Sequence, residues 1–109
     1  MRGQEYGTPY SETATGTARA TATHAASATK TYYITDIAAS CDTSTATLEV
    51  KDGSTVLWQS SLASGTAYGV FIQTFSTPLG ATKGNAVTIT VGTASATSPS
   101  RVNIAGYEL

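Results

Sequence analysis

Residues 47–62 read TLEVKDGSTVLWQSSL, two short segments of alternating apolar and polar side chains with Asp52 and Gly53 between them. Alternation with a period of two is typical of a β-strand that buries one face, and an Asp-Gly pair between two such segments predicts a hairpin. The length of the loop then decides which side chains share a face, because a shift of one residue turns a whole strand over.

A loop of two residues would divide the apolar side chains of the hairpin between its two faces. A loop of three residues, 51–53, ending in a left-handed glycine, places Leu48 opposite Val56. The same register places Ala46 opposite Trp58, so that nearly all the large apolar side chains lie on one face. We therefore predict the three-residue loop.

Composition limits what this chain can bind. Its 109 residues suffice for one domain, and charged residues make up 12% of them, about half of the roughly 25% usual for soluble domains. The six Lys and Arg residues are scattered singly, so neither nucleic acid nor a membrane surface is an expected partner.

The N-terminus has no apolar signal core, and we expect synthesis in the host cytoplasm. A single cysteine, Cys41, excludes an internal disulfide and a multi-cysteine metal site.

Further alternating segments follow the same period of two, and none has the period of a helix. Together they predict an all-β fold, an antiparallel β-sandwich of seven to eight strands over residues 18–109. The predicted strands cover residues 18–25, 31–40, 45–50, 54–61, 68–75, 87–91 and 101–109. The predicted core consists of Leu48, Val50, Val56, Trp58, Val87, Ile89, Val91, Val102 and Ile104.

Two segments suggest contacts outside this core. Residues 1–17 are polar and rich in small side chains, so we predict an extended N-terminal arm with Tyr6 and Tyr10 as its anchors. In residues 68–75 both faces of the strand carry apolar side chains, which predicts a central strand or one that faces another subunit. Pro78 is expected to end that strand. Phe71 within it is a candidate interface residue, as is Tyr107 near the C-terminus.

Catalytic chemistry finds little support. His24 is the only histidine, which excludes a His-pair metal site, and a triad of His24 with a serine and Asp36 or Asp42 lacks any nucleophile-elbow motif. Asp52 is explained by its turn, whereas Asp36 interrupts a strand and is expected to bond a loop or a neighbouring chain. We predict no enzyme, no cofactor and no metal.

Four stretches carry a resemblance to small structural proteins encoded beside the capsid genes of tailed bacteriophages. They are YYITDIAAS at 32–40, LEVKDGSTVLWQSSL at 48–62, FSTPLGATKGNAVTITV at 75–91 and VNIAGYEL at 102–109. The resemblance covers roughly residues 30–109 and lies in the order of a Y-x-I-T strand, a D-G-x-x-V-x-W hairpin, an F-x-x-P-L connection, a G-N-A-V strand and a terminal V-N-x-x-G-Y.

The resemblance implies a jelly-roll-like sandwich on the exterior of an icosahedral head, a decoration or cement protein that contacts the major capsid protein and its own copies as a homodimer or homotrimer. Related sandwiches also serve in head fibres and tail appendages. The alternative is therefore an appendage module that recognises a host glycan or surface protein through loops such as 63–67, 80–86 and 92–100.

Overall fold

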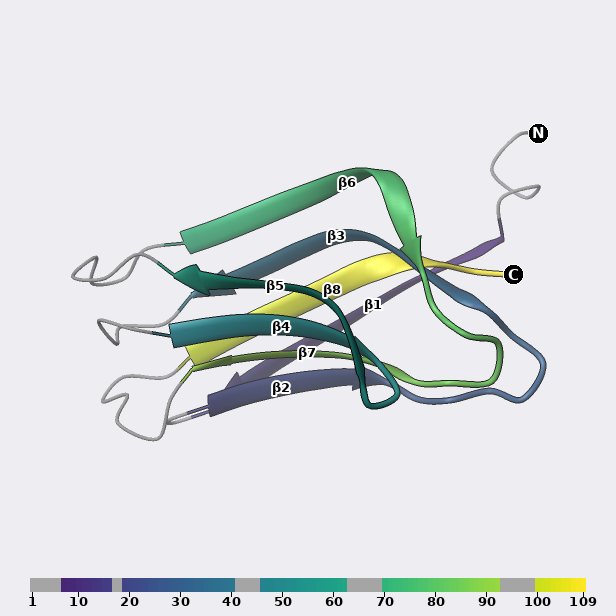
Figure 1. Ribbon diagram of the computed structural model, residues 1–109, viewed down its shortest axis with the longest axis horizontal. Helices are drawn as coiled ribbons and strands as arrows, with labels where there is room; N and C mark the ends of the chain where they lie inside the picture. Colours follow the sequence, from purple (N-terminus) through teal and green to yellow (C-terminus); the bar gives the residue numbers. More distant parts are fainter. Residues whose placement is uncertain (1–6, 17–18, 41–45, 63–69, 93–99) are drawn as a thin grey trace.

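The computed structural model describes residues 7–16, 19–40, 46–62, 70–92 and 100–109. These residues form eight strands and no helix (Figure 1), so they contain no helix that could cross a membrane. The strands are β1 Thr8–Gly16, β2 Arg19–His24, β3 Tyr32–Ser40, β4 Ala46–Asp52, β5 Thr55–Leu62, β6 Val70–Gly80, β7 Val87–Gly92 and β8 Ser100–Glu108.

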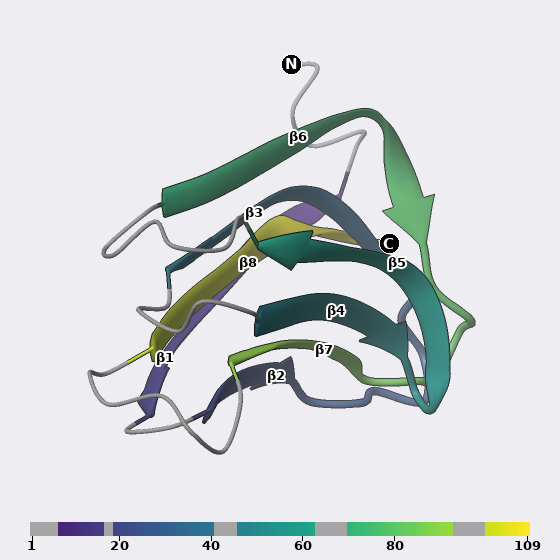
Figure 2. The same ribbon diagram turned by 60° about the vertical axis from the view of Figure 1, so that its left-hand side comes forward.

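The strands make two antiparallel sheets with the orders β1-β8-β3-β6 and β2-β7-β4-β5. Every connection between consecutive strands passes from one sheet to the other, except the β4–β5 hairpin. This is the strand order of a jelly roll. Figures 1 and 2 show β5 and β6 together on one side of the sandwich, with β1 and β2 on the opposite side. The predicted all-β, jelly-roll-like sandwich is confirmed.

The core lies between the inner faces of the two sheets and is made of aliphatic side chains. All of the predicted core residues are fully buried, with the exception of Val56 and Trp58. Val56 is 41% exposed, and Trp58 is half-buried and packs against the core from its edge. Placing Val56 in the core was therefore wrong, for a reason that lies in the hairpin.

The hairpin turns one residue later than either predicted loop. Asp52 pairs with Thr55, so the loop is Gly53 and Ser54, and Gly53 has a φ of 59°. The register slips between Val50 and Lys51, where Leu57 bulges. Val50 consequently lies opposite Trp58, and Val56 lies opposite Lys51 on the outer face. The predicted three-residue loop is wrong.

The cause of the shifted turn is the Asp52 carboxylate, which belongs to the end of β4 and is only 8% exposed. Its Oδ2 accepts hydrogen bonds from the backbone N–H and the hydroxyl of Thr82 at 2.9 and 2.8 Å, and its Oδ1 accepts one from Asn85 at 2.9 Å. Burial raises the pKa of this carboxyl, but the hydrogen bonds from Asn85 and Thr82 outweigh it and lower the pKa below its usual value. Asp52 therefore fastens the hairpin tip to the β6–β7 connection.

The predicted boundary between an arm and a domain is wrong for residues 8–16, which form β1. This strand pairs with β8 along its whole length, from Thr8 opposite Glu108 to Gly16 opposite Ser100. Its one large apolar side chain, Tyr10, is buried. A single apolar residue gives hardly any periodic signal, and the partner strand lies near the other end of the chain. Residues 1–6 and 17 of the predicted arm lie outside the described residues.

Two further expectations for β6 are corrected. β6 does not end at Pro78, as predicted, but continues to Gly80. Residues 75–78 loop out opposite the bulge of β3 at Thr35, and the pairing with β3 resumes at Leu79. In this detour Pro78 need not donate a ladder hydrogen bond. β6 is also the last strand of its sheet, so the alternative of a central strand is wrong, while the alternative of a strand that faces another subunit stays a prediction.

Candidate functional site

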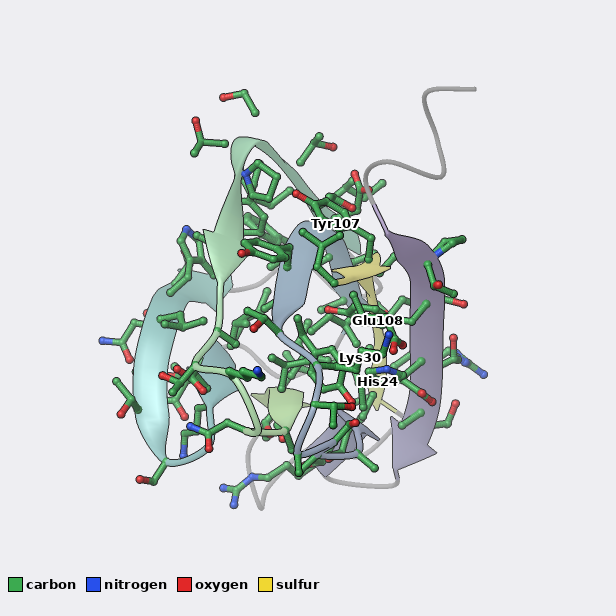
Figure 3. All side chains as sticks on the ribbon, turned by 90° about the vertical axis from the view of Figure 1, so that its right-hand side faces the viewer. His24, Lys30, Tyr107 and Glu108 are labelled. Atoms are coloured by element: carbon green, nitrogen blue, oxygen red, sulfur yellow. The ribbon has the colours of Figure 1, made fainter. Side chains whose placement is uncertain are left out.

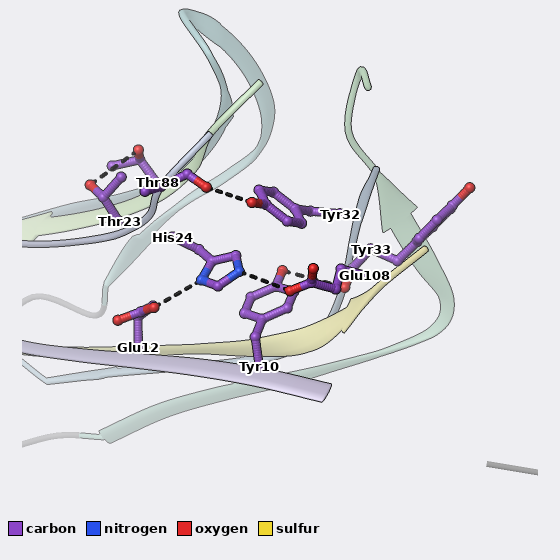
Figure 4. Close-up of polar contacts among 9 residues, drawn as sticks. Tyr10, Glu12, Thr23, His24, Tyr32, Tyr33, Thr88 and Glu108 are labelled. Atoms are coloured by element: carbon purple, nitrogen blue, oxygen red, sulfur yellow. Dashed lines mark hydrogen bonds and ion pairs between the residues drawn. The ribbon is translucent and has the colours of Figure 1, made fainter. Parts of the chain in front are cut away.

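The side chains most suggestive of chemistry gather around His24. Its Nδ1 lies 2.8 Å from Glu12 Oε2, and its Nε2 lies 3.5 Å from Glu108 Oε1 (Figure 4). The imidazole stacks on the ring of Tyr10 at 4.2 Å between centroids and meets the edge of Tyr32 at 4.5 Å. Figure 3 shows His24 and Glu108 close together at this end of the sandwich. Because β2 belongs to one sheet and β1 and β8 to the other, the His24 cluster joins the two layers.

The geometry of the His24 cluster suits packing better than catalysis. The two carboxylates bind opposite edges of the imidazole, so they cannot converge on one ion, and no metal-binding group of His, Cys, Asp and Glu occurs among the described residues. Burial, followed by the charges of Tyr32, Glu108 and Glu12, raises the pKa of Tyr10, and burial followed by Glu108 raises that of Tyr32. Both hydroxyls therefore stay protonated at neutral pH, and Tyr32 donates to the Ala25 carbonyl at 2.5 Å.

We expect His24→Phe to lower the free energy of unfolding by about 1–2 kcal/mol, because phenylalanine keeps the ring stacking but leaves Glu12 and Glu108 without their partner. Denaturant unfolding monitored by circular dichroism measures this loss. Glu12→Gln, which retains an oxygen for a hydrogen bond with His24, is the matched control, with an expected loss below about 0.5 kcal/mol. Equal losses in both variants would contradict this account of the His24 cluster.

The two strands that end the sheets on the opposite side of the sandwich contain no charged residue. Residues 53–82 contain no Asp, Glu, Lys, Arg or His, although these make up 14 of the 109 residues. This stretch includes the whole of β5 and β6, which are the terminal strands of the two sheets on the same side of the sandwich (Figure 2). We call β5 and β6 together the uncharged edge.

Apolar side chains line the uncharged edge. Trp58 of β5 packs against Phe71 and Phe75 of β6, with ring centroids 5.6 and 5.8 Å apart, and all three rings are half-buried. On the outer faces, Ile72 is 70% exposed and Val56 is 41% exposed. Exposed apolar side chains beside partly exposed aromatic rings are typical of a surface that binds another protein.

A second aromatic feature lies on the outer face of the β1-β8-β3-β6 sheet. Tyr33 and Tyr107 are direct cross-strand partners whose rings stack at 5.1 Å between centroids, and both are half-buried. Pro9 lies opposite Tyr107 on one side and Gly80 opposite Tyr33 on the other. A Cβ added to Gly80 would come within 3.3 Å of the Tyr33 ring, so glycine there leaves room for that ring.

The four predicted anchors do not form one site. Tyr6 lies outside the described residues, and Tyr10 is buried beside His24, so its proposed role as a capsid anchor is wrong. Phe71 belongs to the uncharged edge, and Tyr107 belongs to the outer tyrosine pair. The prediction missed Ile72 as the most exposed large apolar side chain among the described residues.

Asp36 has a structural use, but its partners are strand residues and not the predicted loop or neighbouring chain. It is exposed, and its Oδ2 accepts a hydrogen bond from Thr35 at 2.8 Å while its Oδ1 accepts one from Thr74 of β6 at 3.0 Å. Asp36 thus ties β6 to β3 beside the β-bulge. With Asp36, each carboxylate among the described residues has a partner within the chain: Glu12, Asp36, Glu49, Asp52 and Glu108.

No protein-family model matches this chain, and no curated protein does. Among solved structures it is similar to one described as "CBM4 structure and function", at 17% identity and a TM-score of 0.44. The match covers 81% of this chain and 60% of the other, so this chain spans less than two thirds of the length of that protein. It is also similar to a carbohydrate-binding module, CBM36, in complex with calcium and xylotriose, at 12% identity and a TM-score of 0.44 over 80% and 70% of the two chains. A third is the virus-like particle of extra small virus from the prawn Macrobrachium rosenbergii, at 15% identity and a TM-score of 0.42 over 92% and 77%. These likenesses concern the fold alone.

Proposed function

We propose that this chain is a non-catalytic structural component of a bacteriophage virion, a decoration protein that attaches to the outside of an icosahedral head. Its partners are the major capsid protein and its own copies. The observation that carries the proposal is the uncharged edge, where β5 and β6 contain no charged residue, end their two sheets on the same side and expose Val56 and Ile72. The resemblance of residues 30–109 to head-associated phage proteins supports it.

Assembly suits this molecule better than chemistry because His24 and the carboxylates of the described residues are occupied in holding the fold. The Asp52 carboxylate fastens two loops, and Asp36 ties β6 to β3. His24 lies between Glu12 and Glu108, in the cluster that joins the two sheets. The exposed Val56 and Ile72 can pack against another protein, and many weak contacts on a repeating lattice add up to tight attachment.

Attachment through an uncharged surface has a specific signature. Salt screens interactions between charges, and the uncharged edge contributes none, so we expect occupancy on purified heads to change little between about 0.05 and 0.5 M salt. Heads produced without this chain would be incubated with the purified protein, and bound copies quantified against the major capsid protein by gel densitometry. We expect saturable binding, with bound copies comparable in number to the capsid subunits.

Val56→Glu is the informative variant in this experiment, because it introduces a charge on an exposed apolar residue of β5. We expect it to reduce occupancy about tenfold or more, since the charge loses hydration in a packed contact. Ser11→Glu, which adds the same charge to an exposed position of β1, is the matched control and should bind as the wild type does. No binding of the wild-type protein to heads would refute the proposed function.

A specific observation favours one alternative, an appendage module that binds a glycan. The outer tyrosine pair, Tyr33 and Tyr107, stacks two rings on each other with the polar groups of Asp36 one row away on the same face. Aromatic rings beside hydrogen-bonding groups are the means by which proteins hold sugars. This alternative predicts a few copies per virion and binding on a glycan array that Tyr33→Ala abolishes, whereas the decoration function predicts many copies and no glycan signal.

A further inference from the structure

β6 has a second edge, on the side away from β3. Within the described part of the chain β6 pairs with β3 alone, so the backbone groups on its other side have no strand beside them. Residues 70–74 pair with residues 36–40 in an unbroken register. A regular terminal strand of this kind is a template on which another strand can add.

Soluble proteins usually protect such edges with charges, prolines, bulges or a covering segment. Here β5 has a bulge at Leu57, and the second half of β6 has Pro78 and the detour of residues 75–78. β1 is flanked by β2, to which the His24–Glu12 contact holds it. Residues 70–74 read VFIQT, with no charge, proline or bulge, and no described strand covers their second side. They also hold Ile72, whose side chain is 70% exposed on the outer face of the sheet.

We propose that residues 70–74 of β6 pair antiparallel with the same residues of a second copy of this chain, about a two-fold axis at Ile72. This register places Ile72 opposite its own copy and Phe71 opposite Gln73 of the other subunit. The β1-β8-β3-β6 sheet then continues into that of the second subunit as one eight-stranded sheet. A two-fold contact of this kind is self-complementary, as the commonest protein dimers are.

Charge identifies the occupant as a second copy. A strand from a charged partner would find no opposite charge on residues 53–82, whereas two copies of this stretch meet without like-charge repulsion. Pairing also covers the exposed Ile72 side chain with an apolar one, and cross-strand aliphatic pairs stabilise a sheet. The inference deepens the proposed function by naming self-association at the uncharged edge, but the dimer is measurable without a virion.

The first test is the mass of the purified protein in solution. Sedimentation equilibrium and light scattering up to about 100 μM are expected to show a dimer. Ile72→Lys places two positive charges against each other at the axis, and we expect it to raise the dimer Kd by about tenfold or more. Ser11→Lys, on the outer face at the other edge of the same sheet, should leave the dimer unchanged. Circular dichroism must show that both variants are folded.

The second test traps the contact itself. In a Cys41→Ser background, Ile72→Cys places two thiols opposite each other in adjacent strands, within the Cα separation of about 4.4–6.8 Å that a disulfide requires. We expect mild oxidation to yield a covalent dimer at least about tenfold faster than for Ser11→Cys, which has no partner at the axis.

Three results would overturn the inference: a monomer throughout the concentration range, a trimer, or a dimer that Ile72→Lys leaves intact. A monomer in solution that still decorates heads would reject the β6 contact and leave the proposed function standing. A β6 dimer that does not bind heads would do the reverse.

Discussion

Replacing Gly106 by alanine is expected to cost this protein about 3 kcal/mol or more of its free energy of unfolding, the largest loss among the variants considered. Gly106 lies in β8 opposite Ile34, at the point where β3 bulges. A Cβ added there would overlap the carbonyl oxygen of Tyr33, which is backbone and cannot rotate away. The β3–β8 pairing would have to separate locally. Urea unfolding at neutral pH measures the loss.

Gly84→Ala is the matched control for this clash. Gly84 has a φ of 91° and nothing within 4 Å of an added Cβ, so alanine there meets backbone strain alone. We expect a loss of about 1 kcal/mol. A Gly106→Ala variant no less stable than Gly84→Ala would show that β3 and β8 are not packed as described.

Asp52→Ala is expected to lower the free energy of unfolding by about 2–4 kcal/mol. The change removes an acceptor of three hydrogen bonds and leaves the donors of Thr82 and Asn85 unpaired in a partly buried site. The turn at Gly53 should lose order as well, since the Asp52 carboxylate fastens it to the β6–β7 connection. Asp36→Ala is the control, because Asp36 is exposed and its loss should cost below about 1 kcal/mol.

The contribution of Asp52 also has a defined pH dependence. Its pKa is lower in the folded protein than in the unfolded chain, so the stabilisation is fully present above the ordinary carboxyl pKa of 3.8 and is lost as pH falls through the folded value. The stability difference between wild type and Asp52→Asn should therefore be constant from pH 7 to about 5 and shrink below about pH 4. A difference that does not change down to pH 3 would contradict a charged Asp52 in the folded state.

Sequence periodicity was sufficient to identify the sandwich and most of its core. Strands such as β7, with Val87, Ile89 and Val91 on one face, alternate without interruption, and each of those side chains is fully buried. The same reasoning failed where the alternation was weak or interrupted. β1 has one large apolar residue, Tyr10, and β5 contains a bulge that no local pattern marks.

The candidate site was only partly predictable. The apolar character of both faces of residues 68–75 predicts a strand that could face another subunit. Phe71, the interface candidate in this segment, is partly buried against the core, and its role in an interface stays a prediction. That residues 53–82 lack charge is visible in the sequence alone, but the position of β5 and β6 on one side depends on these strands ending their two sheets together. Tyr10 was misjudged because its burial depends on His24 and Tyr32.

By itself the sequence determined that this protein is made of strands, because alternation and turn residues act between neighbours along the chain. The tertiary structure alone decided the register of the hairpin, because Asp52 accepts a hydrogen bond from Thr82, thirty residues away in the sequence. It also decided the place of β1 beside β8, the meeting of His24 with Glu12 and Glu108, and the merging of an uncharged stretch into one edge. These depend on which distant segments gain most free energy by packing together, and no local pattern contains that choice.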